Sequence, residues 1–173
     1  MRKYVFTNET IKIDGHILHR IIAVRDFGRV KAGETGGFVE REENLSHHFD
    51  AWVGNSATVY GNAKVYGDAM VYDNARVSDL AKVGVNARVY DSAKVSGHAW
   101  VYVGAHVNGN SKVYGEAEVY ESACVNGNAR VSGKAKVSGH AWVFGEAEVS
   151  GDAQVYGNAR VYENAKVEEG RIK

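Results

Sequence analysis

The hydrophobic positions of the chain repeat with a strict period of six. Valine occupies every sixth position from Val53 to Val167, twenty times without a miss, and alanine stands two residues before each valine, except at Ser111. This period differs from the 3.6 residues of a helix and from the simple alternation of a strand. It is typical of hexapeptide repeats that stack into a parallel β-helix. The repeat therefore predicts an all-β chain built as a parallel β-helix.

Each hexapeptide predicts one short strand and one corner. The valine and the preceding alanine point inward, and the residues that flank the valine point outward. Pairs such as Gly-Asn, Gly-Asp and Asp-Asn make the corners because they tolerate positive φ. Three sides close a triangular coil of eighteen residues, so twenty repeats predict about six coils, roughly 30 Å long. Valines fill the interior, and a functional site is therefore expected on the outside, at an end or between subunits.

Periodicity divides the chain into three parts, which are an aperiodic leader (1–50), the repeats (51–167) and a short charged tail (168–173). The leader contains strand-like segments at 4–6, 10–13 and 16–24, with turn signals at Asn8-Glu9 and Asp14-Gly15. A stack of repeats needs an atypical unit to cover its open end. We therefore expect the leader to be an N-terminal β cap on the first coil.

The repeats resemble those of the hexapeptide-repeat superfamily, and this resemblance implies a left-handed β-helix. The leader adds a narrower resemblance, because the segments 19–27, 30–33, 36–40 and 44–46 are similar to those of the bacterial YdcK-type proteins. These proteins are often assigned to the acyltransferases, although the family has no established reaction. The resemblance covers the whole chain. It is specific for the fold and says little about activity.

Residues eighteen apart are predicted to stack into rows on three outward faces. The first, which we call the basic face, carries the cationic row Arg76, Lys94, Lys112 and Arg130. Four cations about 4.8 Å apart, lined by serine hydroxyls, predict a binding site for a polyanion or a phosphate-bearing ligand. The alternative is a solvated face that keeps the prism soluble.

The second face, which we call the aromatic face, is the most apolar outward surface. Its candidate interface residues are Trp52, Met70, Tyr72, Tyr90, Trp142, Phe144 and Tyr162. Large exposed aromatic area usually marks an interface, so this face predicts a homo-oligomer, either a trimer or a dimer. The alternative is that the rings only stabilise their neighbours along the row. The third face is mixed, with a small apolar corner at Val85 and Val103.

Composition narrows the classes of function. Lys+Arg and Asp+Glu are both 21, which argues against a protein drawn to nucleic acid by its charge, and sequence-specific nucleic acid binding is not expected. The chain has no apolar run of membrane-spanning length, and its N-terminus lacks a secretion signal. A cytoplasmic protein without membrane contact is therefore the expectation. The single cysteine, Cys124, has no partner for a disulfide or a thiolate metal site.

Enzymes of the hexapeptide-repeat superfamily imply a different activity, acyl transfer from acetyl-CoA or another acyl-CoA. They use a histidine as general base in a cleft between subunits, for which His98, His106 and His140 are weak candidates here. The valine register never slips between 53 and 167, so no loop is inserted to build such a cleft. Neither a metal site nor a cofactor is predicted. The favoured interpretation is a non-catalytic scaffold or binding module that self-associates through the aromatic face and binds an anion on the basic row. An acyltransferase is the alternative.

Overall fold

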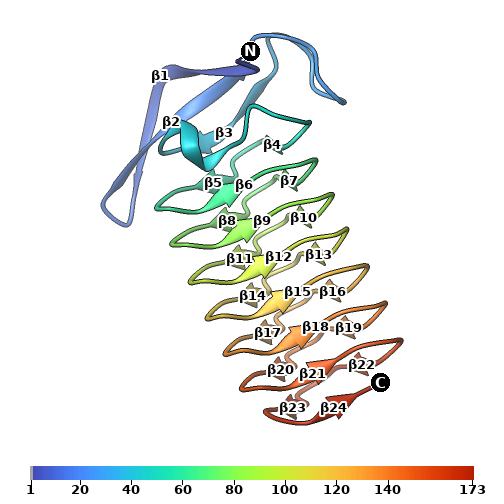
Figure 1. Cartoon of the computed structure of the whole chain (residues 1–173). Coiled ribbons are helices and arrows are strands. Elements are labelled where there is room, and N and C mark those ends of the chain that lie inside the picture. Colours follow the sequence, from blue (N-terminus) through green and yellow to red (C-terminus); the bar gives the residue numbers. More distant parts are fainter. Residues whose placement is uncertain (1) are drawn as a thin grey trace.

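The computed structural model describes residues 2–173 and shows a triangular prism of stacked coils (Figure 1). The helical part of these residues is one short 3-10 turn, η1 (Glu42–Asn44). No helix in residues 2–173 is long and apolar enough to cross a membrane. The predicted all-β class is therefore confirmed.

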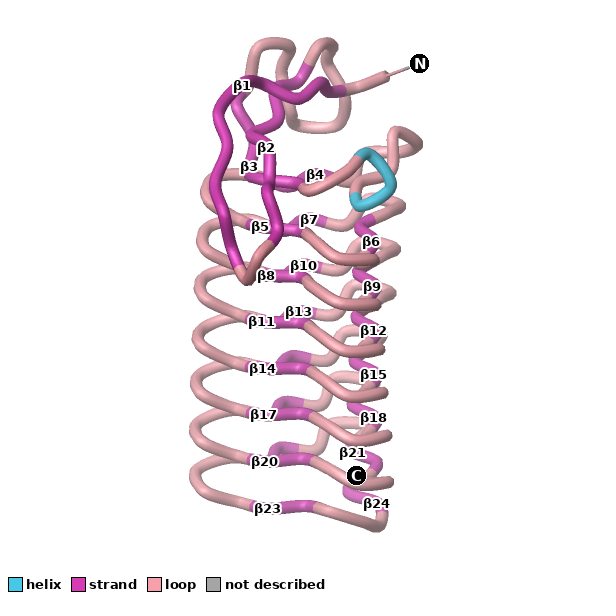
Figure 2. Tube along the Cα trace, turned by 90° about the vertical axis from the view of Figure 1, so that its left-hand side faces the viewer, coloured by secondary structure: helices cyan, strands magenta, loops and turns pink. Residues whose placement is uncertain are grey.

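Three parallel sheets form the sides of the prism (Figures 1 and 2). The basic face consists of β5 (Thr58–Val59), β8 (Arg76–Val77), β11 (Lys94–Val95), β14 (Lys112–Val113), β17 (Arg130–Val131), β20 (Glu148–Val149) and β23 (Lys166–Val167). The aromatic face consists of β4 (Trp52–Val53), β7 (Met70–Val71), β10 (Arg88–Val89), β13 (His106–Val107), β16 (Cys124–Val125), β19 (Trp142–Val143) and β22 (Arg160–Val161). The third face consists of β6 (Lys64–Val65), β9 (Lys82–Val83), β12 (Trp100–Val101), β15 (Glu118–Val119), β18 (Lys136–Val137), β21 (Gln154–Val155) and β24 (Arg171–Ile172).

The register between coils is the predicted eighteen residues through the repeats. Arg88 pairs with Met70 on one side and with His106 on the other, in parallel, and the same spacing holds on the other faces. The expected number of about six coils is too low. Seven strands stack on the aromatic and third faces, and eight parallel strands stack on the basic face. The difference arises because the leader contributes β3 (Thr35–Val39) next to β5, and the tail contributes β24 next to β21.

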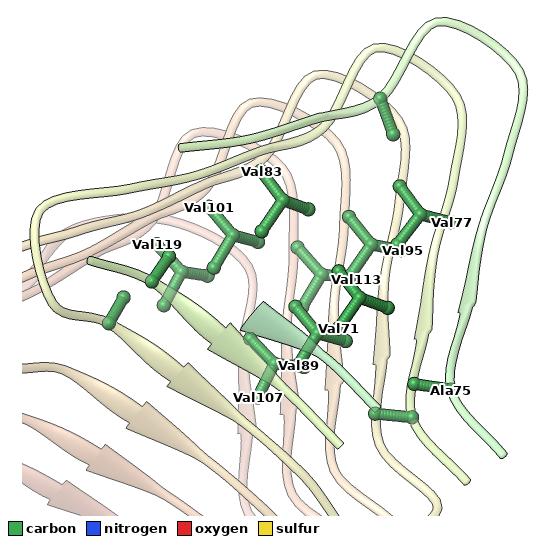
Figure 3. Packing of buried hydrophobic residues seen from close by; sticks show 14 of the residues in the cluster. Val71, Ala75, Val77, Val83, Val89, Val95, Val101, Val107, Val113 and Val119 are labelled. Atoms are coloured by element: carbon green, nitrogen blue, oxygen red, sulfur yellow. The ribbon is translucent and has the colours of Figure 1, made fainter. Parts of the chain in front are cut away.

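Valine and alanine fill the interior (Figure 3). From Val71 to Val155 every valine of the repeat has no exposed surface, and the alanines beside them are equally buried. Burying one valine stabilises the fold by about 1.5–3 kcal/mol before the loss of chain entropy. Ser111, which replaces one alanine, is also buried, and its hydroxyl donates a hydrogen bond to the Asn108 carbonyl at 2.6 Å. The core therefore has no space for a ligand.

The leader folds as a cap on the first coil. Strand β1 (Tyr4–Ile13) pairs antiparallel with β2 (His16–Ala23), which pairs antiparallel with β3. The turn expected at Asn8-Glu9 is not formed, because β1 is continuous and absorbs the irregularity as a register shift between Phe6 and Thr10. The tip of the hairpin reaches down the basic face past β5, where the Tyr60 hydroxyl donates to the Asp14 carboxylate at 2.8 Å (Figure 2).

A buried lysine ties the cap to the first coil. Lys3 has no exposed surface, and its Nζ donates hydrogen bonds to the carbonyls of Phe49 (3.2 Å) and Ala51 (2.5 Å). The same ammonium lies 5.0 Å from the centre of the Phe27 ring. Burial lowers the pKa of Lys3 to about 8, with the neighbouring Asp50 charge acting in the opposite direction. The cap is therefore held in part by a cation that is costly to desolvate.

We expect this lysine to make stability depend on pH. The pKa of Lys3 is lower in the folded protein than the ordinary value of 10.5, so the unfolded chain binds this proton more tightly. The free energy of unfolding should therefore rise by up to about 3 kcal/mol between about pH 8 and pH 10.5. Denaturant titrations of the wild type and of Lys3→Met across this range isolate the effect, since other titrating groups are common to both proteins. Parallel pH profiles for the two proteins would contradict the expectation.

Candidate functional site: the outward faces of the prism

The rings of the aromatic face form two stacked groups. Tyr72 and Tyr90, on neighbouring rungs, stack with centroids 5.1 Å apart and planes within 1° of parallel. Phe144 and Tyr162 stack at 5.4 Å, and Trp142 meets Phe144 edge to face at 6.4 Å. The spacing follows from the coil register, because residues eighteen apart occupy adjacent strands. Each ring of the two pairs Tyr72–Tyr90 and Phe144–Tyr162 is therefore packed against a ring of the neighbouring coil.

Exposure differs among the predicted interface residues. Trp142 and Tyr162 are 46% and 48% exposed, whereas Met70, Tyr72, Tyr90 and Phe144 are half-buried. Trp52 is outward as predicted but only 2% exposed, which corrects its expected place on the open surface. The cap covers it, with the Phe27 ring 5.4 Å and the Tyr4 ring 6.5 Å from the Trp52 ring. Trp52 therefore fastens the leader to the prism.

The aromatic face is cationic and carries no carboxylate at the outward positions of its strands. Its charged side chains are Arg88 and Arg160, and no residue of these strands takes part in an ion pair within the described part of the chain. His106, on the strand after Arg88, is half-buried. Burial is the main cause that lowers the pKa of its imidazole, and the Arg88 charge is the second. His106 is therefore neutral near pH 7.

The centre of the aromatic face is polar and uncharged. Asn108 donates a hydrogen bond to the Tyr90 hydroxyl, and the Asn126 amide lies 3.8 Å from the sulfur of Cys124. Burial raises the pKa of the Cys124 thiol. The thiol is thus protonated at neutral pH, which disfavours it as a nucleophile. These residues separate the two stacked groups of rings.

A hollow of about 480 Å³ lies where the leader meets the aromatic face. The loop between β2 and β3 projects beside β4 at the capped end of the prism (Figure 1). The hollow is lined by Gly28, Arg29, Val30, Asp50, Asp68, Met70, Tyr72, Asn86 and Arg88. The repeat did not predict this hollow, because periodicity says nothing about where an aperiodic loop rests.

The predicted cationic row exists on the basic face. Lys94 pairs in register with Arg76 and Lys112, and Lys112 pairs with Arg130. Part of its charge is neutralised, because Glu148 lies 3.2 Å from Arg130 and 3.4 Å from Lys166. Within residues 2–173, Lys94 and Lys112 form no ion pair and border a shallow hollow with Ser96 and Tyr114. Anion binding by this row stays a prediction.

The three candidate histidines are not brought together. His98 and His140 lie at exposed corners, where their backbone N–H groups donate to the carbonyls of the coil below. His106 lies on the aromatic face. Among the described residues, no carboxylate is hydrogen-bonded to any of the three side chains. A general base is commonly oriented by such a group, and the catalytic role of these histidines stays a prediction.

The structure brings aromatic side chains of the third face into contact with one another. Trp100 packs against Tyr102 with ring centroids 4.7 Å apart, and its Nε1 donates a hydrogen bond to the Tyr66 hydroxyl at 3.0 Å. Tyr66 and Trp100 are two rungs apart and meet across Gly84, where an added Cβ would come within 2.3 Å of the Tyr66 ring. The signal in the sequence is a glycine within a row of outward tyrosines.

Comparison with known proteins supports the repeat architecture. Residues 63–79 and 153–169 match the family model of the YdcK beta solenoid repeat. Both segments begin at an alanine that precedes a strand of the third face, five coils apart, so the model recognises the same phase of the coil twice. No curated protein shows a significant sequence match to the chain. The chain is therefore similar to this family in its β-solenoid repeat.

We expect Gly84→Ala to disturb the third face. The added methyl group would displace the Tyr66 ring and break its hydrogen bond with Trp100. Gly54→Ala is the matched control, because Gly54 also follows a valine and an added Cβ there meets its nearest neighbour at an ordinary 3.5 Å. Gly84→Ala should be less stable than Gly54→Ala by about 1 kcal/mol, with altered tryptophan fluorescence. Equal stability and unchanged fluorescence would show that Tyr66 does not depend on this gap.

Proposed function

We propose that the chain is a non-catalytic β-solenoid scaffold that forms a symmetric dimer through its aromatic face. One observation carries this proposal. The aromatic face combines exposed Trp142 and Tyr162 with strands that have no outward carboxylate and, in residues 2–173, no ion pair. The other two faces contain carboxylates, and these pair with cations of their own face, as Glu148 and Glu118 do. Interfaces are likewise enriched in aromatic residues, Met and Arg, and depleted in Asp and Glu.

If two prisms pack antiparallel, the apolar residues of their two aromatic faces meet. A two-fold axis along the strand direction at β13 would set β7 opposite β19 of a second copy. Met70 would then face Trp142, and Tyr72 would face Phe144. One ring of each stacked group would thus pack against a ring of the partner's other stacked group, and both would bury apolar area.

The charges of the face also suit this arrangement. Arg160, on the last strand of the face, would lie opposite β4, near Asp50 and Asp68 at the edge of the hollow. His106 would meet its own copy at the axis, where its lowered pKa favours the neutral imidazole and avoids repulsion. Charge complementarity of this kind sets register and orientation more than affinity.

The face has most of the area that a standard interface buries. A side of six residues at about 3.3 Å each is about 20 Å wide, and the six uncovered strands from β7 to β22, about 4.8 Å apart, cover about 29 Å. The product is about 580 Å², compared with roughly 800 Å² per partner for a standard interface. The leader loop, which borders the hollow beside this face, would add to the buried area.

Acyl transfer is less well supported than self-association. The resemblance that suggests it concerns the repeat, and fold alone does not specify a reaction. Within residues 2–173 no carboxylate is hydrogen-bonded to the side chains of His98, His106 and His140, and His98 and His140 stand at separate exposed corners. Binding of a polyanion to the basic face rests on Lys94 and Lys112, whose charges have no partner within residues 2–173.

Light scattering coupled to size-exclusion chromatography should show a dimer at micromolar concentration. Trp142→Glu places a carboxylate in the apolar contact with Met70 of the partner and should raise the dissociation constant at least about 30-fold. Tyr114→Glu is the matched control, because Tyr114 is 40% exposed on the basic face. It should leave the dimer unchanged. A wild-type monomer at high concentration, or equal effects of both variants, would contradict the proposal.

Cross-linking tests the orientation. In the antiparallel dimer, β10 lies opposite β16 of the partner, so Arg88→Cys should form interchain disulfides with Cys124 under mild oxidation. Lys82→Cys, on the third face of the same coil, should not. A Cys124 to Cys124 cross-link in the wild type would instead indicate parallel prisms, because that arrangement sets each strand against its own copy.

A further inference from the structure

The outward tyrosines of the third face form a row with two gaps. Reading the positions after the valines in steps of eighteen, the row contains Tyr66, Gly84, Tyr102, Tyr120, Ser138 and Tyr156. The first gap, at Gly84, is filled by the Tyr66 ring, which leans across it to reach Trp100. The second gap, at Ser138, is not filled by any neighbouring ring among the described residues. A hollow of about 370 Å³ lies there.

The second gap has the dimensions of one planar ring. Tyr102 and Tyr120 stack on adjacent strands with centroids 5.2 Å apart and planes 16° from parallel. Tyr120 and Tyr156 stand two strands apart, which corresponds to about 10 Å. A ring placed midway would therefore lie about 5 Å from each tyrosine, the spacing that this face already uses. Tyr102 covers the other side of Tyr120, so the free side of Tyr120 is the one toward Ser138.

The surroundings of the gap favour a negatively charged ligand. Besides the two tyrosines and Ser138, the hollow is lined by Lys136, Gln154 and Arg171. Lys136 is shared with Glu118, whose carboxylate lies 3.0 Å from its Nζ. Arg171 is exposed and takes part in no ion pair within residues 2–173. Two cations and one carboxylate leave one positive charge, and the guanidinium can bind a carboxylate or phosphate with two hydrogen bonds.

We propose that the gap between Tyr120 and Tyr156 binds a small planar aromatic anion. Its ring stacks between the two tyrosine rings, and its carboxylate or phosphate contacts Arg171 and Lys136. Ser138 and Gln154 supply hydrogen bonds to polar atoms at the rim of the ring. The Gly84 gap supports this assignment, because in the same row an unoccupied ring position is closed by an aromatic side chain. The site lies on the third face and leaves the aromatic face free, so it goes beyond the proposed dimer.

Calorimetric titration with two probes tests the site and identifies the chemical class of its ligand. Adenosine monophosphate represents the nucleoside phosphates, and 4-hydroxybenzoate represents the aromatic carboxylates. At least one of the two probes should bind at one site per chain. The probe that binds more tightly identifies the ligand class. The probe that binds should lose at least tenfold in affinity when its anionic group is removed, as adenosine or phenol. Arg171→Gln should weaken it to a similar degree. No saturable heat from either probe at millimolar concentration would overturn the proposal.

Filling the gap provides the sharpest variant. Ser138→Tyr completes the tyrosine row and should abolish binding of the probe while raising the thermal midpoint by a few degrees. Ser132→Tyr is the matched control, since Ser132 also follows a valine but lies on the basic face. It should bind the probe as the wild type does. Tyr156→Ala removes one wall and should abolish binding without filling the site, which keeps the test valid if Ser138→Tyr folds poorly.

Two further results would overturn the proposed site. Unchanged binding in both Ser138→Tyr and Tyr156→Ala would place the ligand elsewhere and overturn the proposal. If neither probe binds and Ser138→Tyr weakens self-association, the gap accepts an aromatic side chain of a second copy and the proposal is wrong. Because Trp142→Glu acts on another face, it should leave probe binding unchanged. This separates failure of the site from failure of the dimer.

Discussion

The parallel hydrogen bonding between coils, at a register of eighteen residues, is the constraint on which the rest of the structure depends. Each strand within a face, apart from those at its two ends, pairs with the strands one coil above and below. The buried valines and alanines lock this register because a slip of one residue would turn them outward. As a consequence, outward side chains at the same position of successive coils stand about 5 Å apart. That distance suits aromatic stacking, and the pairs on the aromatic and third faces use it.

The same constraint leaves only the outward side chains free to contact other molecules. A core filled by valine and alanine leaves no internal cavity, and a repeat without insertions provides no loop to enclose a substrate. What remains variable is the identity of each outward residue. A row can be continuous, as at Tyr72 and Tyr90, or interrupted, as at Gly84 and Ser138. In such a scaffold, the shape of a row depends on which of its positions are filled, and a single small residue leaves a gap of ring size.

Much of this architecture could be predicted from residue spacing. The inward valines, the corners, the eighteen-residue register and the membership of each outward row follow from local periodicity, and the cationic row from Arg76 to Arg130 lies where it was expected. The candidate site was predicted less completely. Trp52 occupies its predicted row, yet the cap removes it from the surface. The charge of the cationic row is partly neutralised by Glu148, and the contact of Tyr66 with Trp100 across Gly84 on the third face was not predicted.

The sequence by itself determined the periodic part of the protein. Each hexapeptide specifies its own strand and corner, through interactions within one coil and with neighbouring hexapeptides of the same pattern. Only the tertiary structure decided how the aperiodic segments rest on that prism. The buried Lys3, the hairpin tip at Tyr60, the strands β3 and β24 that extend the sheets, and the hollow beside Arg29 all depend on contacts between residues distant in sequence. Such contacts do not recur at a fixed spacing, so periodicity along the chain cannot predict them.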